Sequence, residues 1–417
     1  MGTKVYCVTS ERIKNLKILQ INTTHDIKTS TGRTMIELDL YLKKTGHSSY
    51  MAYSQGEHLE GAYKIGGTFG KKIHALLARV TGLEGYFSRV ATHGLLRYME
   101  KVDPDVIRVA NVHSNYINLP MFFKWVEKKN KPVVLTLDDC WYYTGKCTHY
   151  TTNQCYNWQS KCGNCPKLKE DIPSYFLDRT SKMLLDKKKW YLNVSKLGVV
   201  GVSNWIVEEA KKSVLNSAKM ITRIYNWIDL EIFSPNNDCD LRRKLGLPDK
   251  KIILAVASFW GKSKGIELII EVAKQVEDNI MIVLIGKVPA EIKLPDNIMV
   301  IGSVNNPSEL AAYYNVADVY FNASLEESFG KVTAEALACG TPALVINSTA
   351  SPEIVGNNCG YVAQNNLEDV MKGLSLLLAQ EKVNCSNKCR EWAQRNFAPE
   401  TCMKQYVDIF EQLINGE

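Results

Sequence analysis

The sequence predicts an α/β protein of two domains, each built on a parallel β-sheet covered by helices. Its 417 residues exceed what one ordinary hydrophobic core holds, so two domains are expected. The composition is that of a globular chain, with 45% apolar and 23% charged residues. Short runs of Val, Ile and Leu alternate with helical patterns, and such continuous apolar runs are typical of parallel strands buried on both faces.

The first half of the chain contains four expected strands of one sheet. These apolar runs lie at residues 16–22, 105–111, 131–137 and 196–203. The loop "TSTGRT" (29–34) separates the first run from a helix-like segment, and Gly32 lets the backbone of this loop approach a ligand closely. The loop lacks a complete G-x-G-x-x-G fingerprint, which disfavours a nucleotide-sugar epimerase or dehydrogenase that binds a dinucleotide.

The second half repeats the pattern with four more expected strands. They lie at residues 251–258, 280–286, 317–324 and 341–347, with a helix expected at 265–276. The two halves join near residues 226–237, so we expect domains at 1–223 and 224–397. Ligands bind beyond the carboxyl ends of parallel strands, and the expected site is therefore a cleft between the two sheets.

Two carboxylates eight residues apart, Glu327 and Glu335, are expected on one wall of this cleft. The segment from Phe329 to Cys339 reads as a helix that Gly340 ends. Eight residues of helix separate the two acids by roughly 12 Å along the axis, which suits one elongated ligand held at both ends.

The backbone amides at the start of the same helix are expected to bind an anion between the two acids. They belong to Phe329, Gly330, Lys331 and Val332. An acid, a set of amides and a second acid match the sugar, diphosphate and ribose of a nucleotide-sugar. The alternative is that Glu335 is a buried acid satisfied by local backbone, and that Glu327 is only a charge at the helix start.

The end of the 251–258 strand carries further candidates for binding the donor. Ser258 is followed by Lys262 and Lys264, and Gly265 opens the next helix. Lysines at such a position neutralise phosphates as point charges, so we expect them near the diphosphate.

The sequence resembles the family 4 retaining glycosyltransferases of the GT-B fold over nearly its whole length. The family pattern E-x-F-G-x-x-x-x-E-A-x-A-x-G-x-P is matched by Glu327, Phe329, Gly330, Glu335, Ala336, Ala338, Gly340 and Pro342. Residues 202–210 and 225–235 resemble family segments around the domain junction, and residues 389–414 resemble the family's C-terminal helices.

The resemblance implies two facing Rossmann-like domains around a cleft, with a C-terminal helix at 398–417 that crosses back onto the N-terminal domain. The N-terminal domain would hold a glycan or polyprenyl-linked acceptor, and the C-terminal domain a UDP- or GDP-linked sugar. The resemblance also implies that Glu327 contacts the donor sugar, Glu335 the ribose and Lys264 the diphosphate. Transfer would retain the anomeric configuration without a divalent metal, in surface polysaccharide biosynthesis such as that of a capsule.

Several positions depart from the family pattern. The family commonly has Arg where this chain has Ser258, so Lys262 is the expected substitute. A His-x-His element of the N-terminal domain is replaced by Arg108 and Ala110, which leaves His113 as the candidate catalytic imidazole. A related T-L-H-D element reads "TLDD", with Asp138 in the histidine position and Asp139 matching, and Ser328 replaces a family glycine.

Four cysteines form a cluster in an insertion at about residues 140–170. The four thiols that could bind a tetrahedral zinc ion are those of Cys147, Cys155, Cys162 and Cys165. The loop around them is polar and is expected to lack an apolar core of its own, which a bound metal could replace. We expect a structural zinc ion, with free thiols or disulfides as the alternatives. Similar cysteines occur in a capsular-polysaccharide type of the family.

Charge is distributed unevenly along the chain. Residues 1–200 hold 30 Lys/Arg and 17 Asp/Glu, a net of +13, whereas residues 201–417 hold 21 and 27, a net of −6. A basic half favours an anionic partner such as lipid headgroups. Nucleic-acid binding through the basic half and the cysteines is the alternative function, but no nucleic-acid motif accompanies it.

The expected location is the cytoplasm, with peripheral association at the inner face of the cell membrane. No apolar run is long enough for a membrane span, and the N-terminal residues lack the apolar segment of a secretory signal. Residues 70–82 place Ile73, Leu76, Leu77 and Val80 on one helical face beside three basic residues, Lys71, Lys72 and Arg79. That face is expected either to meet an anionic membrane or to belong to the domain core.

Overall fold

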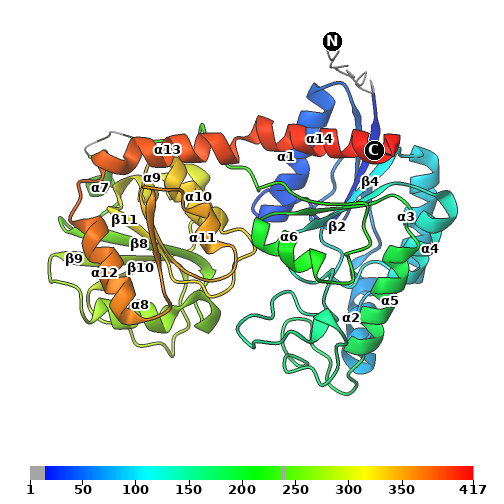
Figure 1. Cartoon of the computed structure of the whole chain (residues 1–417), viewed down its shortest axis with the longest axis horizontal. Helices are drawn as coiled ribbons and strands as arrows, with labels where there is room; N and C mark the ends of the chain where they lie inside the picture. The colour runs from blue at the N-terminus through cyan, green and yellow to red at the C-terminus, as the bar shows by residue number, and fades with distance from the viewer. Residues whose placement is uncertain (1–14, 237, 239, 417) are drawn as a thin grey trace, which may run out of the picture.

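The computed structural model describes residues 15–236, 238 and 240–416, and it contains the two parallel sheets that the sequence predicts. In these residues the first sheet has the strand order β3-β2-β1-β4-β5-β6-β7 and the second has the order β10-β9-β8-β11-β12-β13. Every strand pairing described is parallel, and both sheets are doubly wound (Figure 1).

Eight of the strands in the described residues follow the predicted apolar runs, whereas β2, β3, β7, β10 and β13 were not predicted. Those of the first sheet are β1 (Lys17–Thr24), β2 (Ser48–Gln55), β3 (Tyr63–Lys64), β4 (Val106–Val109), β5 (Val133–Leu137), β6 (Leu197–Gly201) and β7 (Met220–Arg223). Those of the second sheet are β8 (Lys251–Phe259), β9 (Ile280–Lys287), β10 (Ile298–Gly302), β11 (Val319–Asn322), β12 (Ala343–Ile346) and β13 (Gly360–Ala363).

Helices connect the strands and cover both faces of each sheet. In the N-terminal domain they are α1 (Ser30–Lys44), α2 (Thr68–Thr81), α3 (Arg89–Val102), α4 (Leu119–Lys129), α5 (Thr180–Leu192) and α6 (Asn204–Lys211). The C-terminal domain has α7 (Leu241–Lys244), α8 (Ile266–Ala273), α9 (Pro307–Val316), α10 (Lys331–Ala338), α11 (Ser351–Ile354), α12 (Leu367–Leu378) and α13 (Val383–Phe397).

The last helix, α14 (Pro399–Asn415), crosses back to the N-terminal domain as the resemblance implied. It continues the line of α13 along one side of both domains (Figure 1). Tyr406, Phe410 and Leu413 of α14 are buried in one cluster with residues of β1, β4 and β6. Gly198 of β6 permits this close packing, because a Cβ atom there would lie 2.5 Å from a methyl group of Leu413.

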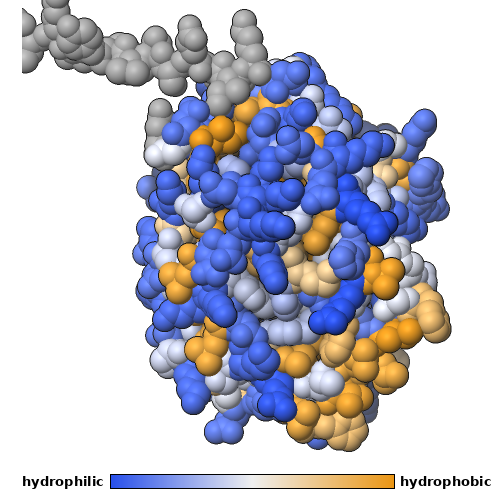
Figure 2. Space-filling model, turned by 90° about the vertical axis from the view of Figure 1, so that its right-hand side faces the viewer, coloured by the Kyte–Doolittle hydropathy of each residue, from blue (hydrophilic) through white to orange (hydrophobic). Residues whose placement is uncertain are grey.

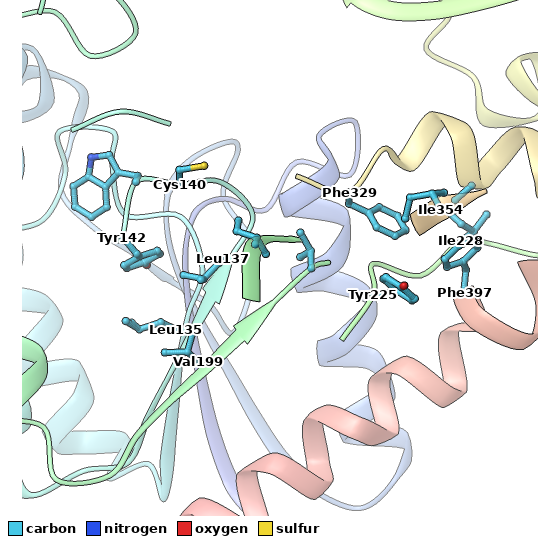
Figure 3. Packing of buried hydrophobic residues seen from close by; sticks show 14 of the residues in the cluster. Leu135, Leu137, Cys140, Tyr142, Val199, Tyr225, Ile228, Phe329, Ile354 and Phe397 are labelled. Atoms are coloured by element: carbon cyan, nitrogen blue, oxygen red, sulfur yellow. The ribbon is translucent and has the colours of Figure 1, made fainter. Parts of the chain in front are cut away.

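A hydrophobic contact also joins the two domains where the chain passes between them. The ring of Tyr225, just after β7, lies 5.8 Å from that of Phe329 and 5.4 Å from that of Phe397. Phe329 precedes α10 and Phe397 ends α13 (Figure 3). The three rings therefore come from the loop before α10 and from the two segments, after β7 and after α13, where the chain passes between the domains. Aromatic contacts of this geometry stabilise a particular orientation of their elements.

The cysteine-rich insertion lies between β5 and α5. Its regular structure in the described residues is one 3-10 turn, η1 (Asn157–Gln159). Trp158 of this turn is buried among Tyr143 and Tyr150. The expectation that the insertion lacks an apolar core was therefore wrong, because its aromatic side chains form a small one.

The helices that the structure describes include none long and apolar enough to cross a membrane. The expectation about a secretory signal rests on the N-terminal residues, most of which lie outside the described part of the chain.

Candidate active site

A cleft of about 690 Å³ opens between the two sheets, and both domains line it. The N-terminal side consists of the turn that starts α1 and of residues that follow β5 and β7. The C-terminal side consists of the ends of β8 and β9, a loop before α9, and the start of α10. The lining residues include Lys28, Thr31, Arg33, Asp138 and Asn226 from the first side, and Ser258, Lys264, Gly286, Asn306, Glu327, Ser328, Phe329, Gly330, Lys331, Val332 and Glu335 from the second.

The N-terminus of α10 faces this cleft. The helix begins at Lys331, two residues later than predicted, because Gly330 adopts a left-handed conformation with φ of 89°. Among the described residues, no backbone oxygen accepts a hydrogen bond from the amides of Gly330, Lys331 or Val332. These donors, together with the helix dipole, suit the start of α10 to an anionic group.

Glu335 lies one turn further along α10, and its side chain is buried. It accepts a hydrogen bond of 3.2 Å from the hydroxyl of Tyr314, a side chain of α9 rather than local backbone. Burial raises the pKa of the Glu335 carboxyl, and the positive charges of Lys331 and Arg33 oppose that rise. Because Arg33 belongs to the N-terminal domain, cations from both domains face this carboxylate.

Glu327 and Lys264 form an ion pair at another part of the cleft. The Nζ of Lys264 lies 2.6 Å from Oε1 of Glu327 and 3.2 Å from the hydroxyl of Ser324. Gly265, which follows Lys264, has φ of 70°, and a Cβ atom there would approach the carbonyl oxygen of Ala323 to 2.1 Å. The glycine thus lets Lys264 lie against the loop of Glu327, and a ligand bound here would meet both charges.

The structure brings most of the predicted donor residues together. Ser258, Phe329, Gly330, Lys331 and Val332 line the same cleft as Lys264, Glu327 and Glu335. Gly32 is not among the residues that line the cleft. It lies in the first turn of α1, where a Cβ atom would be 2.3 Å from the carbonyl oxygen of Asp26. Lys262 is exposed and outside the lining, and its role at the diphosphate stays a prediction.

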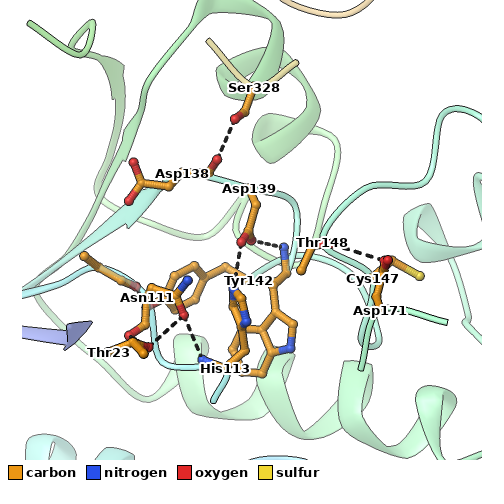
Figure 4. Close-up of polar contacts among 12 residues, drawn as sticks. Thr23, Asn111, His113, Asp138, Asp139, Tyr142, Cys147, Thr148, Asp171 and Ser328 are labelled. Carbon is orange, nitrogen blue, oxygen red and sulfur yellow. Dashed lines mark hydrogen bonds and ion pairs between the residues drawn. The ribbon is translucent and has the colours of Figure 1, made fainter. Parts of the chain in front are cut away.

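His113 lies in a second cavity, of about 360 Å³, rather than in the main cleft. Its Nε2 is 2.7 Å from Oδ2 of Asp139 (Figure 4). Burial acts to lower the pKa of His113, but the charge of Asp139, the hydrogen bond to it and the charge of Glu84 together raise it. A catalytic role for His113 stays a prediction.

Asp138, the neighbour of Asp139, lines the main cleft instead. Burial raises the pKa of Asp138 from 3.8 to about 6, against the positive charge of Arg108. Arg108 is itself buried on β4, where it donates to Oε1 of Gln20 at 3.2 Å and lies over the ring of Tyr406. The side chains of these consecutive acids point in different directions (Figure 4): Asp138 lines the main cleft, and Asp139 contacts His113.

Polar contacts hold the two sides of the cleft together. Oε1 of Glu326 accepts hydrogen bonds from the amide of Thr152, at 2.8 Å, and from the hydroxyls of Thr151 and Thr152. The Ser328 hydroxyl donates to the carbonyl oxygen of Asp138 at 2.5 Å. The residues on both sides of Glu327 thus bind the N-terminal domain, one of them through the cysteine-rich insertion.

A further carboxylate connects the domains at α6. Glu353 accepts hydrogen bonds from the amides of Asn204 and Trp205, at the start of that helix, at 2.8 and 3.0 Å. It also accepts one from the Tyr225 hydroxyl at 3.1 Å. A carboxylate at a helix N-terminus is stabilised by the free amides and the helix dipole, so this contact favours the observed arrangement of the domains.

The four cysteines of the insertion, Cys147, Cys155, Cys162 and Cys165, line one small cavity of about 20 Å³. The thiol of Cys147 is hydrogen-bonded to Cys165, which raises the pKa of the first and lowers that of the second. Across the part of the chain that the structure describes, no group of three or more His, Cys, Asp or Glu side chains is placed to hold a metal ion. The donor set is that of structural zinc, and zinc binding stays a prediction.

Three residues that line the site, Arg33, Lys28 and Asn226, were not predicted from the sequence. Arg33 follows Gly32 directly in a segment that the sequence predicts as a loop after a strand and that the structure places at the start of α1. This position was a signal that could have identified it. No comparable signal marks Asn226, which reaches the cleft from the crossing between the domains.

Comparison with known proteins agrees with this geometry. Residues 238–396 match the sequence model of the family described as glycosyl transferases group 1. The N-acetyl-alpha-D-glucosaminyl L-malate synthase of Bacillus anthracis is 24% identical over 234 residues, which cover 52% of this chain and 60% of that protein. The match thus spans less than two thirds of this relative's length.

Solved structures resemble the whole chain in fold. Sucrose-phosphate synthase from Thermosynechococcus elongatus has a TM-score of 0.72 and 17% identity, covering 97% of this chain and all of that one. Anabaena Alr3699/HepE in complex with UDP and glucose has a TM-score of 0.65 and 13% identity, covering 95% of this chain and all of that one. The chain therefore has the GT-B fold, and residues 238–396 of its C-terminal domain are similar to the group 1 glycosyl transferases.

The opposite pKa shifts of Asp138 and Asp139 predict opposite effects of neutralising them. Because the folded-state pKa of Asp138 is raised, its protonated form contributes stability at low pH that is lost as the pH rises to about 6. Asp138→Asn should therefore raise the free energy of unfolding at pH 8 by about 1–2 kcal/mol, with little effect at pH 4.

Asp139→Asn is the matched control for this measurement. Its folded-state pKa is lowered, chiefly by His113 acting against burial, so its charge contributes stability at high pH that is lost as the pH falls. Asp139→Asn should lower the free energy of unfolding at pH 8. Urea unfolding at both pH values gives the test, and effects of the same sign for the two variants at pH 8 would contradict the assignment.

Proposed function

We propose that this chain is a retaining glycosyltransferase that moves a sugar from a nucleotide-sugar to a glycan or a lipid-linked saccharide. The observation that carries the proposal is the arrangement of acid, free amides and acid along one wall of the interdomain cleft. The group 1 match of the C-terminal domain and the bound UDP and glucose in the Anabaena protein, whose fold is similar, support it. We propose surface polysaccharide biosynthesis as the setting.

In this proposal the diphosphate lies against the amides of Gly330, Lys331 and Val332. Glu335 accepts from the ribose hydroxyls, with its charge balanced by Lys331 and Arg33. Lys264 then lies beside the leaving phosphate, and Glu327 beside the transferred sugar. Donors fixed in this way stabilise the charge that develops on the leaving diphosphate without rearranging, so the catalysis needs no divalent metal.

Retention of configuration follows in this proposal from the leaving phosphate and the acceptor lying on the same face of the sugar. The leaving oxygen takes the proton of the acceptor hydroxyl as the glycosidic bond to the diphosphate breaks and the new bond forms. His113, held by Asp139 in the neighbouring cavity, is proposed to help place the acceptor. The acceptor domain is 1–223 and the donor domain 224–397 in this assignment.

The same proposal places the protein at the inner face of the cell membrane as a peripheral protein, with an anionic membrane surface as a partner. The basic N-terminal half supports this, because positively charged surfaces are attracted to anionic lipids. The alternative function, nucleic-acid binding, has no support, since both the fold and the family match are those of sugar transfer.

Replacing the two acids separately tests the proposed function. Glu335→Gln should weaken nucleotide-sugar binding about tenfold or more, because the ribose loses charge-assisted hydrogen bonds. Glu327→Gln should lower kcat by about a hundredfold with a smaller change in affinity, since its contact is with the reacting sugar. Calorimetric titration of a panel of nucleotide-sugars, followed by transfer assays with the donor that binds, gives both quantities.

Glu309→Gln, an exposed acid on α9, is the control for charge loss. Unchanged binding and turnover in both cleft variants, with any donor that the wild type accepts, would exclude the proposed site.

For the four cysteines we propose a structural zinc ion. Four thiolates satisfy a zinc ion completely, so the ion would stabilise the insertion and take no part in catalysis. Cys162→Ser with Cys165→Ser should lower the melting temperature and release the metal, while the C-terminal domain still binds the donor. Elemental analysis of protein purified without chelator is the measurement, and metal far below one equivalent, with four reactive thiols, would contradict zinc.

A further inference from the structure

An apolar surface near one end of the N-terminal domain remains outside the site described so far. The predicted face of α2 is exposed rather than part of the core: Leu76 is 61% exposed, and Ile73, Leu77 and Val80 are also accessible. Phe69 at the start of α2 is 77% exposed. Figure 2 shows hydrophobic side chains gathered at the lower end of the face that this domain presents.

A second segment extends the same surface. The amide of Tyr175 donates to the carbonyl oxygen of Arg79 at 2.9 Å, so the loop after the cysteine-rich insertion lies against the end of α2. Tyr175, Phe176 and Leu177 of this loop are exposed, Phe176 to 74%. Apolar side chains from two distant parts of the chain therefore form one accessible surface, which is unusual for a free face of a globular protein.

A groove of about 570 Å³ lies between α2 and the start of α3, beside this surface. Its apolar lining includes Ile73, Leu77, Phe87 and Val90, and Val90 is 88% exposed. The charged residues that line it are Lys71 and Arg89, and no acid does. The groove thus combines room for an apolar chain with positive charge.

The charges of the groove are available to a ligand. Within the described residues, neither Lys71 nor Arg89 forms an ion pair; the Nζ of Lys71 donates to the backbone oxygen of Ser54 at 2.8 Å. Helix α2 has no acidic residue, and its basic residues are Lys71, Lys72 and Arg79. Charge complementarity therefore selects an anionic amphiphile over a neutral apolar partner such as another protein's hydrophobic face.

We infer that the groove between α2 and α3 binds the phosphate and the adjoining chain of a membrane-borne lipid acceptor, while the apolar face of α2 lies in the bilayer surface. This inference rests on the proposed sugar transfer and selects a lipid-linked acceptor over a free glycan. The position of the groove suits that role, because Tyr116 in its lining belongs to the same loop as His113.

Vesicle flotation of the full chain tests the inference at low and high salt. Three phosphatidylcholine vesicles are compared: one pure, one with phosphatidylglycerol, and one with a long-chain isoprenyl monophosphate at equal surface charge. We expect the isoprenyl phosphate vesicles to bind about tenfold more tightly than the phosphatidylglycerol vesicles, and both to lose binding in high salt. Equal binding to both anionic vesicles, or no binding, would overturn the inference.

Variants locate the site. Val90→Asp, and Lys71→Ala combined with Arg89→Ala, should each lower binding to isoprenyl phosphate vesicles about tenfold or more. Val383→Asp on α13, where the valine is 69% exposed, is the matched control and should bind like the wild type. Equal binding by the wild type and all variants would exclude the groove.

Nucleotide-sugar binding, measured by thermal shift on the same variants, separates this inference from the proposed function. If groove variants keep the thermal shift from a nucleotide-sugar but no longer bind the vesicles, both the groove inference and the proposed function are supported. If the wild type and all variants show a thermal shift but none binds vesicles, lipid binding in the groove is contradicted and the proposed sugar transfer is not. Vesicle binding without a thermal shift from any nucleotide-sugar would overturn the proposed donor site instead.

Discussion

The buried carboxylate of Glu335 is the constraint on which the arrangement of the cleft depends. It lies in an apolar helix, and a buried charge is tolerated only where opposite charges and hydrogen bonds compensate it. The hydroxyl of Tyr314 supplies one hydrogen bond, and Lys331 and Arg33 supply positive charge. Because Arg33 comes from the N-terminal domain, the charge balance of this wall of the cleft depends on the two domains lying close together.

Other contacts across the cleft also depend on the two domains lying close together. Glu326 and Ser328, which flank Glu327, are both bound to the N-terminal domain, and Glu353 binds the start of α6. An opening of the domains would break these contacts and would change the surroundings of Glu327 at the same time. The residue proposed to contact the reacting sugar is thus positioned by the closed arrangement, a common way in which enzymes complete a site on closure.

Much of the fold could be predicted because its physical signals are local. Buried parallel strands appear as continuous runs of Val, Ile and Leu, and the sequence places β1, β5, β8 and β9 within a few residues of their observed bounds. The start of α10 was placed too early, since an isolated glycine does not reveal that Gly330 adopts a left-handed conformation. The exposure of the α2 face could not be predicted either, because an amphipathic pattern is the same for a face on a core and a face on a membrane.

The candidate site was predictable where a strand end or a helix start carries it, and not where the tertiary structure assembles it. Glu335 and Lys264 were found from their places beside predicted strands and helices. Asp138 and Asp139 are adjacent in sequence, yet they line or support two different cavities, and only the turn after β5 determines which side chain faces which cavity. The position of Arg33 after a predicted strand marks it as a possible site residue, but only the tertiary structure brings it from the other domain toward Glu335.

In the proposed function, the nucleotide-sugar binds in the interdomain cleft with its diphosphate at the start of α10. An experimental structure of the complex with a nucleotide-sugar that binds the protein tests this most directly. We expect diphosphate oxygens within hydrogen-bonding distance of the amides of Gly330, Lys331 and Val332, and ribose hydroxyls at Glu335. A nucleotide bound with its phosphates away from α10, or with Glu335 still covered and in contact only with protein, would contradict it.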